Sequence, residues 1–254
     1  MSKDSSRLVE KDWNTLAGVG VGLVALFGSQ IVVGIILSIY PAIEHWNGQK
    51  ANDWLNNSIA AQFIFVLLAE LLAVYIIYLF IRRYTDGFKR IGLRKPRLPD
   101  PLYGLLGLPP YFVLYFLLLN ISIFFFPSLN TNEKQQVGFT NPHGLSNLIL
   151  TFISLVVLPP IAEELIFRGV IYSSLKKSLP LWAAVLLTSL LFAAGHLPEG
   201  GSAGLLYVGA IDTFSLSLVL IYLREKTGGL WASMTLHALK NCIAFVALFA
   251  LHLG

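Results

Sequence analysis

Seven long apolar segments alternate with short polar segments along this chain. A helix needs about 20 apolar residues to cross the roughly 30 Å hydrocarbon core of a bilayer. Segments of about this length lie at residues 16–40, 58–81, 102–126, 150–175, 181–196, 203–223 and 230–253. The first is too long for a cleavable signal peptide and has no small-residue cleavage site after it. The pattern therefore predicts an all-α, polytopic membrane bundle whose first span is retained.

The composition supports the same class of protein. Of the 254 residues, 56% are apolar and 13% are charged, whereas soluble domains carry about 25% charged residues. The mean hydropathy is +0.69. A disulfide scaffold is excluded because Cys242 is the only cysteine. Disordered and collagen-like chains are excluded by the same composition.

The basic residues predict how the spans are oriented. Alternate polar segments hold 15 and 2 basic residues, with Lys240 left inside a span. Because positive charge collects on the cytoplasmic side, we expect a cytoplasmic N-terminus in the cell membrane. The most basic segment, 82–97, is then explained as an orientation signal that touches anionic lipid, and we expect no nucleic-acid partner.

Polar side chains at membrane depth are the first candidates for a functional site. Glu164 and Arg168 are four residues apart in the fourth span, so a helix places them on one face as an ion pair. Glu163 points about 100° away and stays available for chemistry. The preceding Pro159 and Pro160 predict a helix break near 160. Glu163 would then lie near the positive end of a new helix dipole.

Two further polar groups lie in later spans. His196 ends the fifth span, and a hairpin turn at about 176–180 would bring it to the depth of Glu163. His237 and Asn241 are four residues apart in the last span and share a helix face. Lys240 lies off this face, and we expect it to extend toward the interface.

These residues fall in three motifs that resemble one known family. The motifs are Glu163-Glu164-x-x-x-Arg168, Phe192-x-x-x-His196 and His237-x-x-x-Asn241. They resemble the signature motifs of the CPBP (ABI) family, the CAAX-protease and bacteriocin-processing intramembrane peptidases. Some members are described with eight spans, so an eighth span is left open.

The resemblance implies a division of the chain and a set of partners. It assigns a cytoplasmic tail to 1–15, variable N-terminal transmembrane helices to 16–126 and the peptidase core to 145–254. The interval 127–147 is expected to link the two halves. The implied substrate is a membrane-embedded or lipidated peptide, of which prenylated C-terminal tails and bacteriocin precursors are two kinds. The sequence does not give the oligomeric state.

The resemblance also implies roles for the motif residues. Glu163 would act as the base that activates a water, and His196 would assist it. His237 and Asn241 would bind the oxyanion, with Glu164, Arg168 and Phe192 in support. A Glu163, His196 and His237 set has the ligand types that zinc uses, although the helical H-E-x-x-H pattern is absent. We expect no obligatory metal and leave a divalent metal such as zinc as the alternative.

Other functions need different features. A serine protease would pair Ser202 with His237, which are expected at opposite depths, and an aspartyl protease needs two aspartates where only Asp212 lies well inside a span. A transporter would use Glu70, Asp212 and Lys240 as an ion pathway, although we expect helix–helix contacts to satisfy Glu70 and Asp212. A non-catalytic scaffold or bacteriocin immunity protein remains a further alternative.

Overall fold

A computed structural model describes residues 12–132, 135–139 and 142–251, apart from the side chains of 201–203. The tail residues 1–11 therefore lie outside the described part. Within that part every regular element is helical, and seven helices are long and apolar enough to cross a membrane, which confirms the predicted class and count. These seven are Thr15–Ile43, Ile59–Ile81, Pro99–Phe125, Leu145–Ser178, Leu181–Gly200, Tyr207–Thr227 and Trp231–Ala250.

Short π- and 3₁₀-helical segments interrupt several of these spans. The α-helices are α1 (Thr15–Leu23), α2 (Ser29–Ile43), α3 (Gly48–Asn57), α4 (Ile59–Ile81), α5 (Gly87–Arg90), α6 (Pro99–Leu106), α7 (Leu108–Phe125), α8 (Leu145–Phe152), α9 (Leu158–Glu164), α10 (Tyr172–Ser178), α11 (Leu181–His196), α12 (Tyr207–Thr227) and α13 (Trp231–Phe245). The π-helical segments are η1 (Val24–Gly28), η2 (Ile153–Val157), η3 (Leu165–Ile171) and η5 (Val246–Ala250), and η4 (Leu197–Ala203) is 3₁₀.

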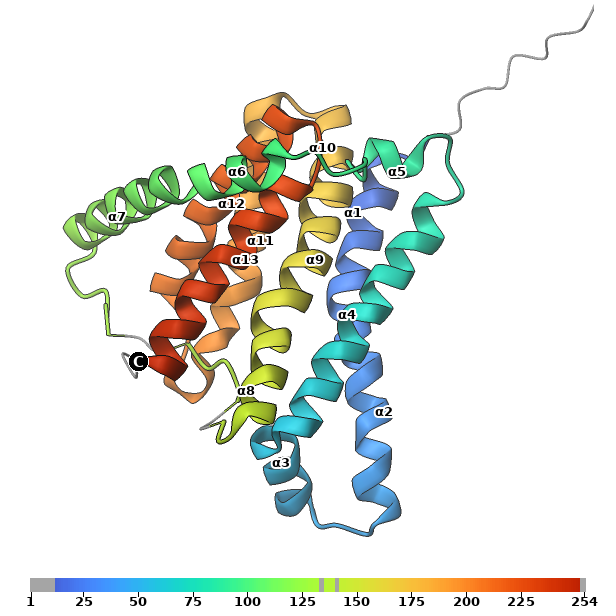
Figure 1. Cartoon of the computed structure of the whole chain (residues 1–254), viewed down its shortest axis with the longest axis vertical. Coiled ribbons are helices and arrows are strands. Elements are labelled where there is room, and N and C mark those ends of the chain that lie inside the picture. Colours follow the sequence, from blue (N-terminus) through green and yellow to red (C-terminus); the bar gives the residue numbers. More distant parts are fainter. Residues whose placement is uncertain (1–11, 133–134, 140–141, 252–254) are drawn as a thin grey trace, which may run out of the picture.

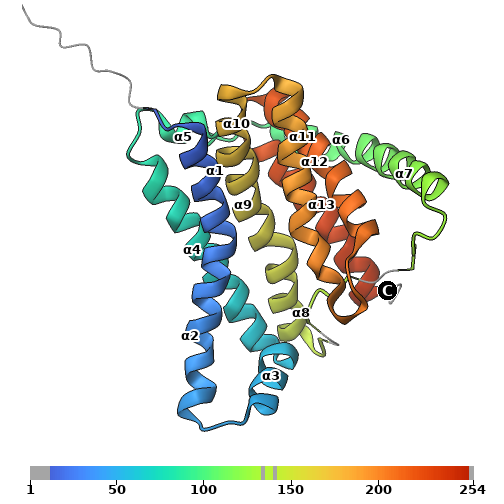
Figure 2. The same ribbon diagram turned by 180° about the vertical axis from the view of Figure 1, so that it is seen from behind.

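The span that contains α8, α9 and α10 runs through the middle of the bundle (Figures 1 and 2). The N-terminal helices α1, α2 and α4 lie on one side of it, and α11, α12 and α13 lie on the other. The outward surfaces of the N-terminal helices are rich in exposed leucine, isoleucine and tyrosine. Such a surface suits hydrocarbon, because in lipid an apolar side chain has no reason to be buried.

The third span departs from the orientation of the others. Its α6 packs on α13, and its α7 begins on α12. α7 then leans obliquely away from the bundle (Figures 1 and 2). Gly107, Pro109 and Pro110 lie where α6 passes into α7, and prolines at a helix start favour such a change of direction. This oblique helix leaves a wide gap beside α11 and α12.

The predicted helix break at the two prolines is wrong. Residues Leu145–Ser178 form one continuous helical span, in which the hydrogen-bond pattern widens to the π form before Pro159 and again after Glu164. Because proline has no backbone N–H, the α-helical hydrogen bonds at Pro159 and Pro160 cannot form. A π segment allows the helix to continue past them. Glu163 is the sixth residue of the seven in α9, so it does not lie at a free helix N-terminus.

The basic segment after α5 does more than set orientation. Arg94 donates to both carboxylate oxygens of Asp100, at 2.8 and 2.6 Å, and to the Thr227 carbonyl. These bonds with Asp100 raise the pKa of Arg94. Trp231 Nε1 donates to the Arg94 carbonyl at 2.6 Å. This segment therefore joins α6 to the turn between α12 and α13.

Candidate active site

The motif residues from three spans meet at one buried cavity. Glu163 on α9, His196 on α11, and His237 and Asn241 on α13 all line a space of about 150 Å³. A water molecule occupies about 30 Å³ in the liquid, so this space suits a few waters or a peptide group. The sequence predicted this convergence from helix depth.

Glu164 and Arg168 form the predicted ion pair. Arg168 Nη1 donates to Glu164 Oε1 at 2.9 Å, and both side chains have no exposed surface. His237 Nδ1 lies 3.2 Å from the same Oε1. A buried ion pair needs further hydrogen bonds to offset the loss of hydration, and His237 supplies one. Glu164 is thereby committed to holding Arg168 and His237 in place.

Glu163 is left for chemistry, because no such partner neutralises it. Its Oε2 lies 3.7 Å from His237 Nε2, beyond a hydrogen bond, and forms no hydrogen bond to the described residues. About 18% of its side chain is exposed, against none of Glu164. A buried carboxylate oxygen without a partner marks a place for a water molecule. Glu163 therefore faces the cavity with an acceptor to spare.

Phe192 is the packing centre of the site. Its ring contacts Phe167, His196 and His237 in edge-on arrangements, with centroids 4.9, 4.7 and 5.8 Å apart. The Arg168 guanidinium lies 4.3 Å from the centroid of the same ring, which is a cation–π contact. Phe192 is fully buried. It fixes both histidines and the arginine relative to one another.

His196 is held in one orientation by its own helix. Its Nδ1 lies 2.8 Å from the Phe192 carbonyl, and because a carbonyl only accepts, Nδ1 carries the hydrogen. In the neutral ring, Nε2 is then an acceptor. Nε2 lies 3.9 Å from Glu199 Oε1. No direct bond joins His196 to Glu163 among the described residues, so the two act across the cavity.

Asn241 forms a hydrogen bond to a backbone carbonyl of the fourth span that has no donor within its own helix. Its Nδ2 donates to the Leu155 carbonyl at 3.0 Å. An α-helical donor to that carbonyl would come from residue 159, and a π-helical one from residue 160. Both are prolines, which have no N–H. The Pro159-Pro160 pair therefore keeps the Leu155 carbonyl free for Asn241.

Pro159→Ala tests this arrangement. The new N–H gives Leu155 an intrahelical donor, so Asn241 loses its fixed position. If Asn241 binds an oxyanion, as the resemblance implies, the rate of the reaction should fall by part of the 10²–10³-fold that such a donor contributes, while the melting temperature stays the same or rises. Pro110→Ala, in α7 and outside the cavity lining, is the matched control. Equal rates in the two variants would contradict the role assigned to the prolines.

Lys240 does not extend to the interface as predicted. Its Nζ lies 2.9 Å from Asp212 Oδ2, and Tyr111 donates its hydroxyl to the other oxygen of Asp212. Lys240 also lines the cavity. An aspartate at this depth attracts the ammonium more strongly than the distant interface does. The expected helix–helix contact of Asp212 is thus present, although the sequence did not identify Tyr111 as its partner.

Part of the expected linker forms one wall of the cavity. Gln135 Nε2 donates to Glu199 Oε2 at 2.6 Å, and the Gln136 amide donates to the Glu199 carbonyl at 2.8 Å. Gln135, Val137 and Glu199 all line the cavity. Only the polarity of this segment was visible in the sequence, and that gave no signal of its place beside His196.

Three further candidates from the sequence are the zinc ligand set, Glu70 and Ser202. The zinc alternative requires Glu163, His196 and His237 around one ion, and among the described residues no three histidine, cysteine or acidic side chains are grouped closely enough. Glu70 lies on α4 with an intermediate exposure. The side chain of Ser202 lies outside the described part of the structure.

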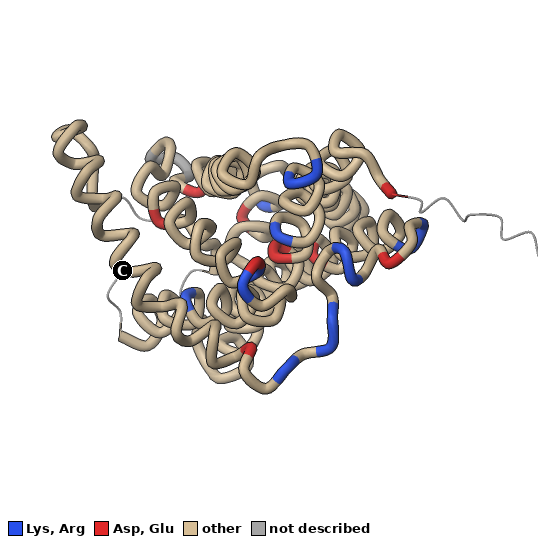
Figure 3. The backbone as a smooth tube through the Cα atoms, turned by 90° about the horizontal axis from the view of Figure 1, so that it is seen from above, with Lys and Arg blue, Asp and Glu red and all other residues tan. Residues whose placement is uncertain are grey.

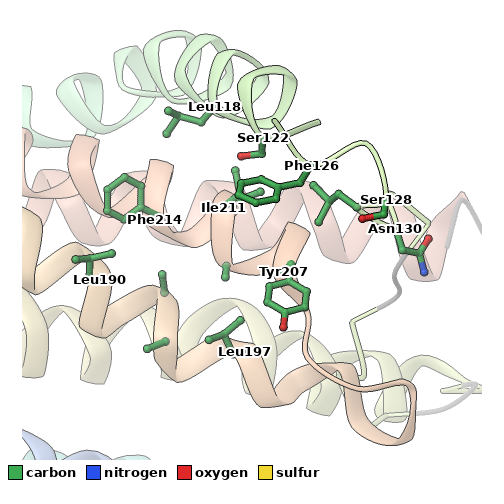
Figure 4. A pocket seen from close by; sticks show the side chains of 14 residues that line it. Leu118, Ser122, Phe126, Ser128, Asn130, Leu190, Leu197, Tyr207, Ile211 and Phe214 are labelled. Atoms are coloured by element: carbon green, nitrogen blue, oxygen red, sulfur yellow. The ribbon is translucent and has the colours of Figure 1, made fainter. Parts of the chain in front are cut away.

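A second, larger cavity lies on the opposite face of α11. It measures about 920 Å³ and is almost wholly apolar. Figure 4 shows side chains from α7, from the segment after it and from α11 and α12 pointing into this space, among them Leu118, Phe126, Leu190, Ile211 and Phe214. Ala193 and Ala194 face it from α11 and Leu197 from the start of η4, next in sequence to His196, which lines the polar cavity.

Comparison with known proteins agrees with the motifs. Residues 145–243 match the family model described as "Type II CAAX prenyl endopeptidase Rce1-like". An "Uncharacterized 24.3 kDa protein" of Escherichia coli is 30% identical over 96 residues, which are 37% of this chain and 42% of that protein. The match thus spans less than half of the relative. No solved structure matches the chain significantly.

The matched range contains every motif residue from Glu163 to Asn241. The helices α1 to α7 lie outside the matched range. The match to the model of the CAAX prenyl endopeptidase family agrees with the resemblance that the three motifs carry, and it extends over residues 145–243 of this chain.

Proposed function

We propose that this protein hydrolyses a peptide bond of a membrane-associated substrate at the cavity between α9, α11 and α13. One observation carries the proposal. The Oε2 atoms of both adjacent glutamates lack a hydrogen bond within the described part of the chain. Glu164 is fully buried and committed to Arg168 and His237 through Oε1, whereas Glu163 lines the cavity. A structural ion-pair network has no use for the second carboxylate, whereas water activation requires it.

The proposed reaction uses this chain's own side chains. A water lies between the Glu163 carboxylate and His196 Nε2, which accepts one of its hydrogens. Glu163 removes a proton as the water oxygen attacks the carbonyl carbon, and the carbonyl oxygen becomes an oxyanion. The C–N bond then breaks, and the proton on Glu163 passes to the departing amine. The immediate products are a carboxylic acid and an amine, and transfer of the acid proton to the amine gives a carboxylate and an ammonium, so atoms and charge balance.

His237 and Asn241 are placed to stabilise the oxyanion. His237 Nδ1 lies 3.2 Å from Glu164 Oε1, and its Nε2 lies on the side of Glu163, at 3.7 Å from Oε2. A proton on Nε2 during the reaction would make this nitrogen a donor to the oxyanion. Asn241 uses one amide hydrogen on the Leu155 carbonyl and keeps its second for the oxyanion. Donors that are held in place before the reaction need no reorganisation as charge develops.

Asn241→Ala is expected to lower kcat by about 10²–10³-fold with little change in KM, because the oxyanion exists only in the transition state. Steady-state hydrolysis by the purified protein measures both constants. Asn120→Ala is the matched control, since that asparagine lies in α7 and donates to its own helix at Phe116. A rise in KM with unchanged kcat would assign Asn241 to substrate binding.

The substrate we propose is a lipidated or membrane-embedded peptide. The apolar cavity beside α11 suits a lipid chain, since α11 and α12 contribute residues both to it and to the polar cavity. The matched family is described by its action on CAAX prenyl substrates, which favours a prenylated peptide. We also propose the cytoplasmic membrane as the location, with the N-terminus in the cytoplasm, from the distribution of basic residues.

The test compares peptide termini in membranes of cells that express the wild type or Glu163→Ala at matched levels. We expect discrete new termini with the wild type only, and their sequences identify the substrate. If the two sets of termini agree while a wild-type phenotype survives the substitution, Glu163 is structural. A scaffold, an immunity protein or a transporter would then replace the peptidase.

A further inference from the structure

A second polar cavity lies at the end of the bundle that carries α5 and α10, far along the fourth span from the active site. It measures about 400 Å³. Its lining comes from the segment before α1, from the ends of α5 and α12 and from α10, and consists of Asp12, Trp13, Arg90, Tyr172, Ser173, Lys176, Lys177, Arg224 and Glu225. The proposed function uses none of these residues.

The residues that line this cavity come from the four basic segments of the chain. Residues 1–15, 82–101, 168–180 and 224–229 are the segments whose positive charge predicts a cytoplasmic location. The fold brings one or two basic residues from each of the last three to one place, together with Asp12 and Trp13 from the first. Figure 3 views the molecule from this end and shows basic positions gathered around the helix ends.

The charges of the lining do not cancel. Four basic side chains face two carboxylates, which leaves a formal surplus of two positive charges. Asp12 already accepts from both Arg90, at 2.9 Å, and Lys177, at 2.6 Å. Glu225 is paired with Lys176. Each carboxylate is thus in use, and an anion that enters the cavity meets net attraction.

Arg224 is held over the cavity by the backbone rather than by an acid. Its Nη2 donates to the Arg90 carbonyl at 3.2 Å, and its Nε is buried with no hydrogen-bond partner among the described residues. A Cβ at Gly92, where φ is +86°, would lie 2.6 Å from the guanidinium carbon. The glycine therefore lets a guanidinium lie against the backbone, and guanidinium is the group that best matches phosphate geometry.

We propose that this cavity binds the phosphate group of an anionic phospholipid in the cytoplasmic leaflet. The cavity opens where helices leave the hydrocarbon, which is the level of lipid headgroups. That leaflet carries the negative surface charge of a cell membrane. Trp13 is buried, and Lys177 Nζ lies 3.7 Å from the centroid of its ring, which holds this cation at the cavity. This proposal does not depend on the peptidase activity.

The test counts lipids bound to the full-length protein in detergent by native mass spectrometry. Phosphatidylglycerol and phosphatidylcholine with identical acyl chains are titrated separately, and we expect tighter binding of phosphatidylglycerol. Lys176→Gln with Lys177→Gln should weaken that binding by about 5-fold for each cation removed. Lys89→Gln with Lys226→Gln removes the same charge outside the cavity lining and should leave the preference unchanged.

Two further arms decide between sources of the phosphate. Sodium phosphate should displace phosphatidylglycerol at concentrations where sodium chloride of equal ionic strength does not. Asp12→Asn should tighten binding because it removes a negative charge from the lining, and this holds even if the double lysine variant fails to fold. Equal binding of the two lipids, equal loss in the two salts, or equal effects of the two lysine pairs would overturn the proposal.

Discussion

Glu163→Gln is expected to lower the rate of peptide hydrolysis by about 10²–10⁴-fold, the range that a general base contributes. The amide keeps the shape of the side chain but cannot accept the proton of the attacking water. The melting temperature of the variant should be unchanged or higher. Glu163 Oε2 is buried without a hydrogen-bond partner in the described part of the chain, and burying a neutral amide there costs less free energy than burying a carboxylate.

The measurement is hydrolysis of the peptide found by the comparison of termini, with the protein purified in detergent. Glu44→Gln makes the same chemical change at an exposed position at the end of α2 and should retain full activity. Retention of more than half of the wild-type rate by Glu163→Gln would remove Glu163 from the reaction. A loss of rate together with a lower melting temperature would indicate a structural role instead.

Arg168→Met is expected to destabilise the protein by about 3–5 kcal/mol, the usual cost of breaking a buried ion pair. The substitution leaves Glu164 buried without its cationic partner and removes the cation over the Phe192 ring. Unfolding by denaturant in detergent micelles measures the change in the free energy of unfolding.

The double variant Glu164→Gln with Arg168→Met distinguishes the contribution of the ion pair from that of the other contacts of Arg168. Once both charges are gone, most of the lost stability should return, because no buried charge is left without a partner. Additive losses in the two single variants would show that Arg168 stabilises the bundle through packing on Phe192 alone. Activity is not the readout, since Glu164 also positions His237.

Part of the site could be predicted from the sequence because the geometry of an α-helix repeats regularly along the chain. The pairing of Glu164 with Arg168 follows from a spacing of four residues. The hairpin between α10 and α11 fixes the depth of His196 relative to Glu163, since both helices rise by 1.5 Å per residue from the same turn. These predictions needed only local geometry.

Other parts of the site depend on contacts that spacing does not encode. His237 lies between Glu163 and Glu164, at 3.7 and 3.2 Å, only because α13 packs against α9. Lys240 turns to Asp212 for a similar reason, since α12 and α13 are neighbours. The prolines were expected to end a helix, but the π segments kept the span continuous.

By itself the sequence determined the membrane class, the seven spans and the resemblance of residues 145–243 to one family of endopeptidases, because hydropathy, charge and motif spacing are properties of the chain. Only the tertiary structure decided that His237 contacts Glu164 in addition to Arg168, and that Asn241 donates to the Leu155 carbonyl. It also decided that residues of four separate basic segments line one cavity. Those facts depend on which helix faces meet, and the packing of the bundle alone decides that.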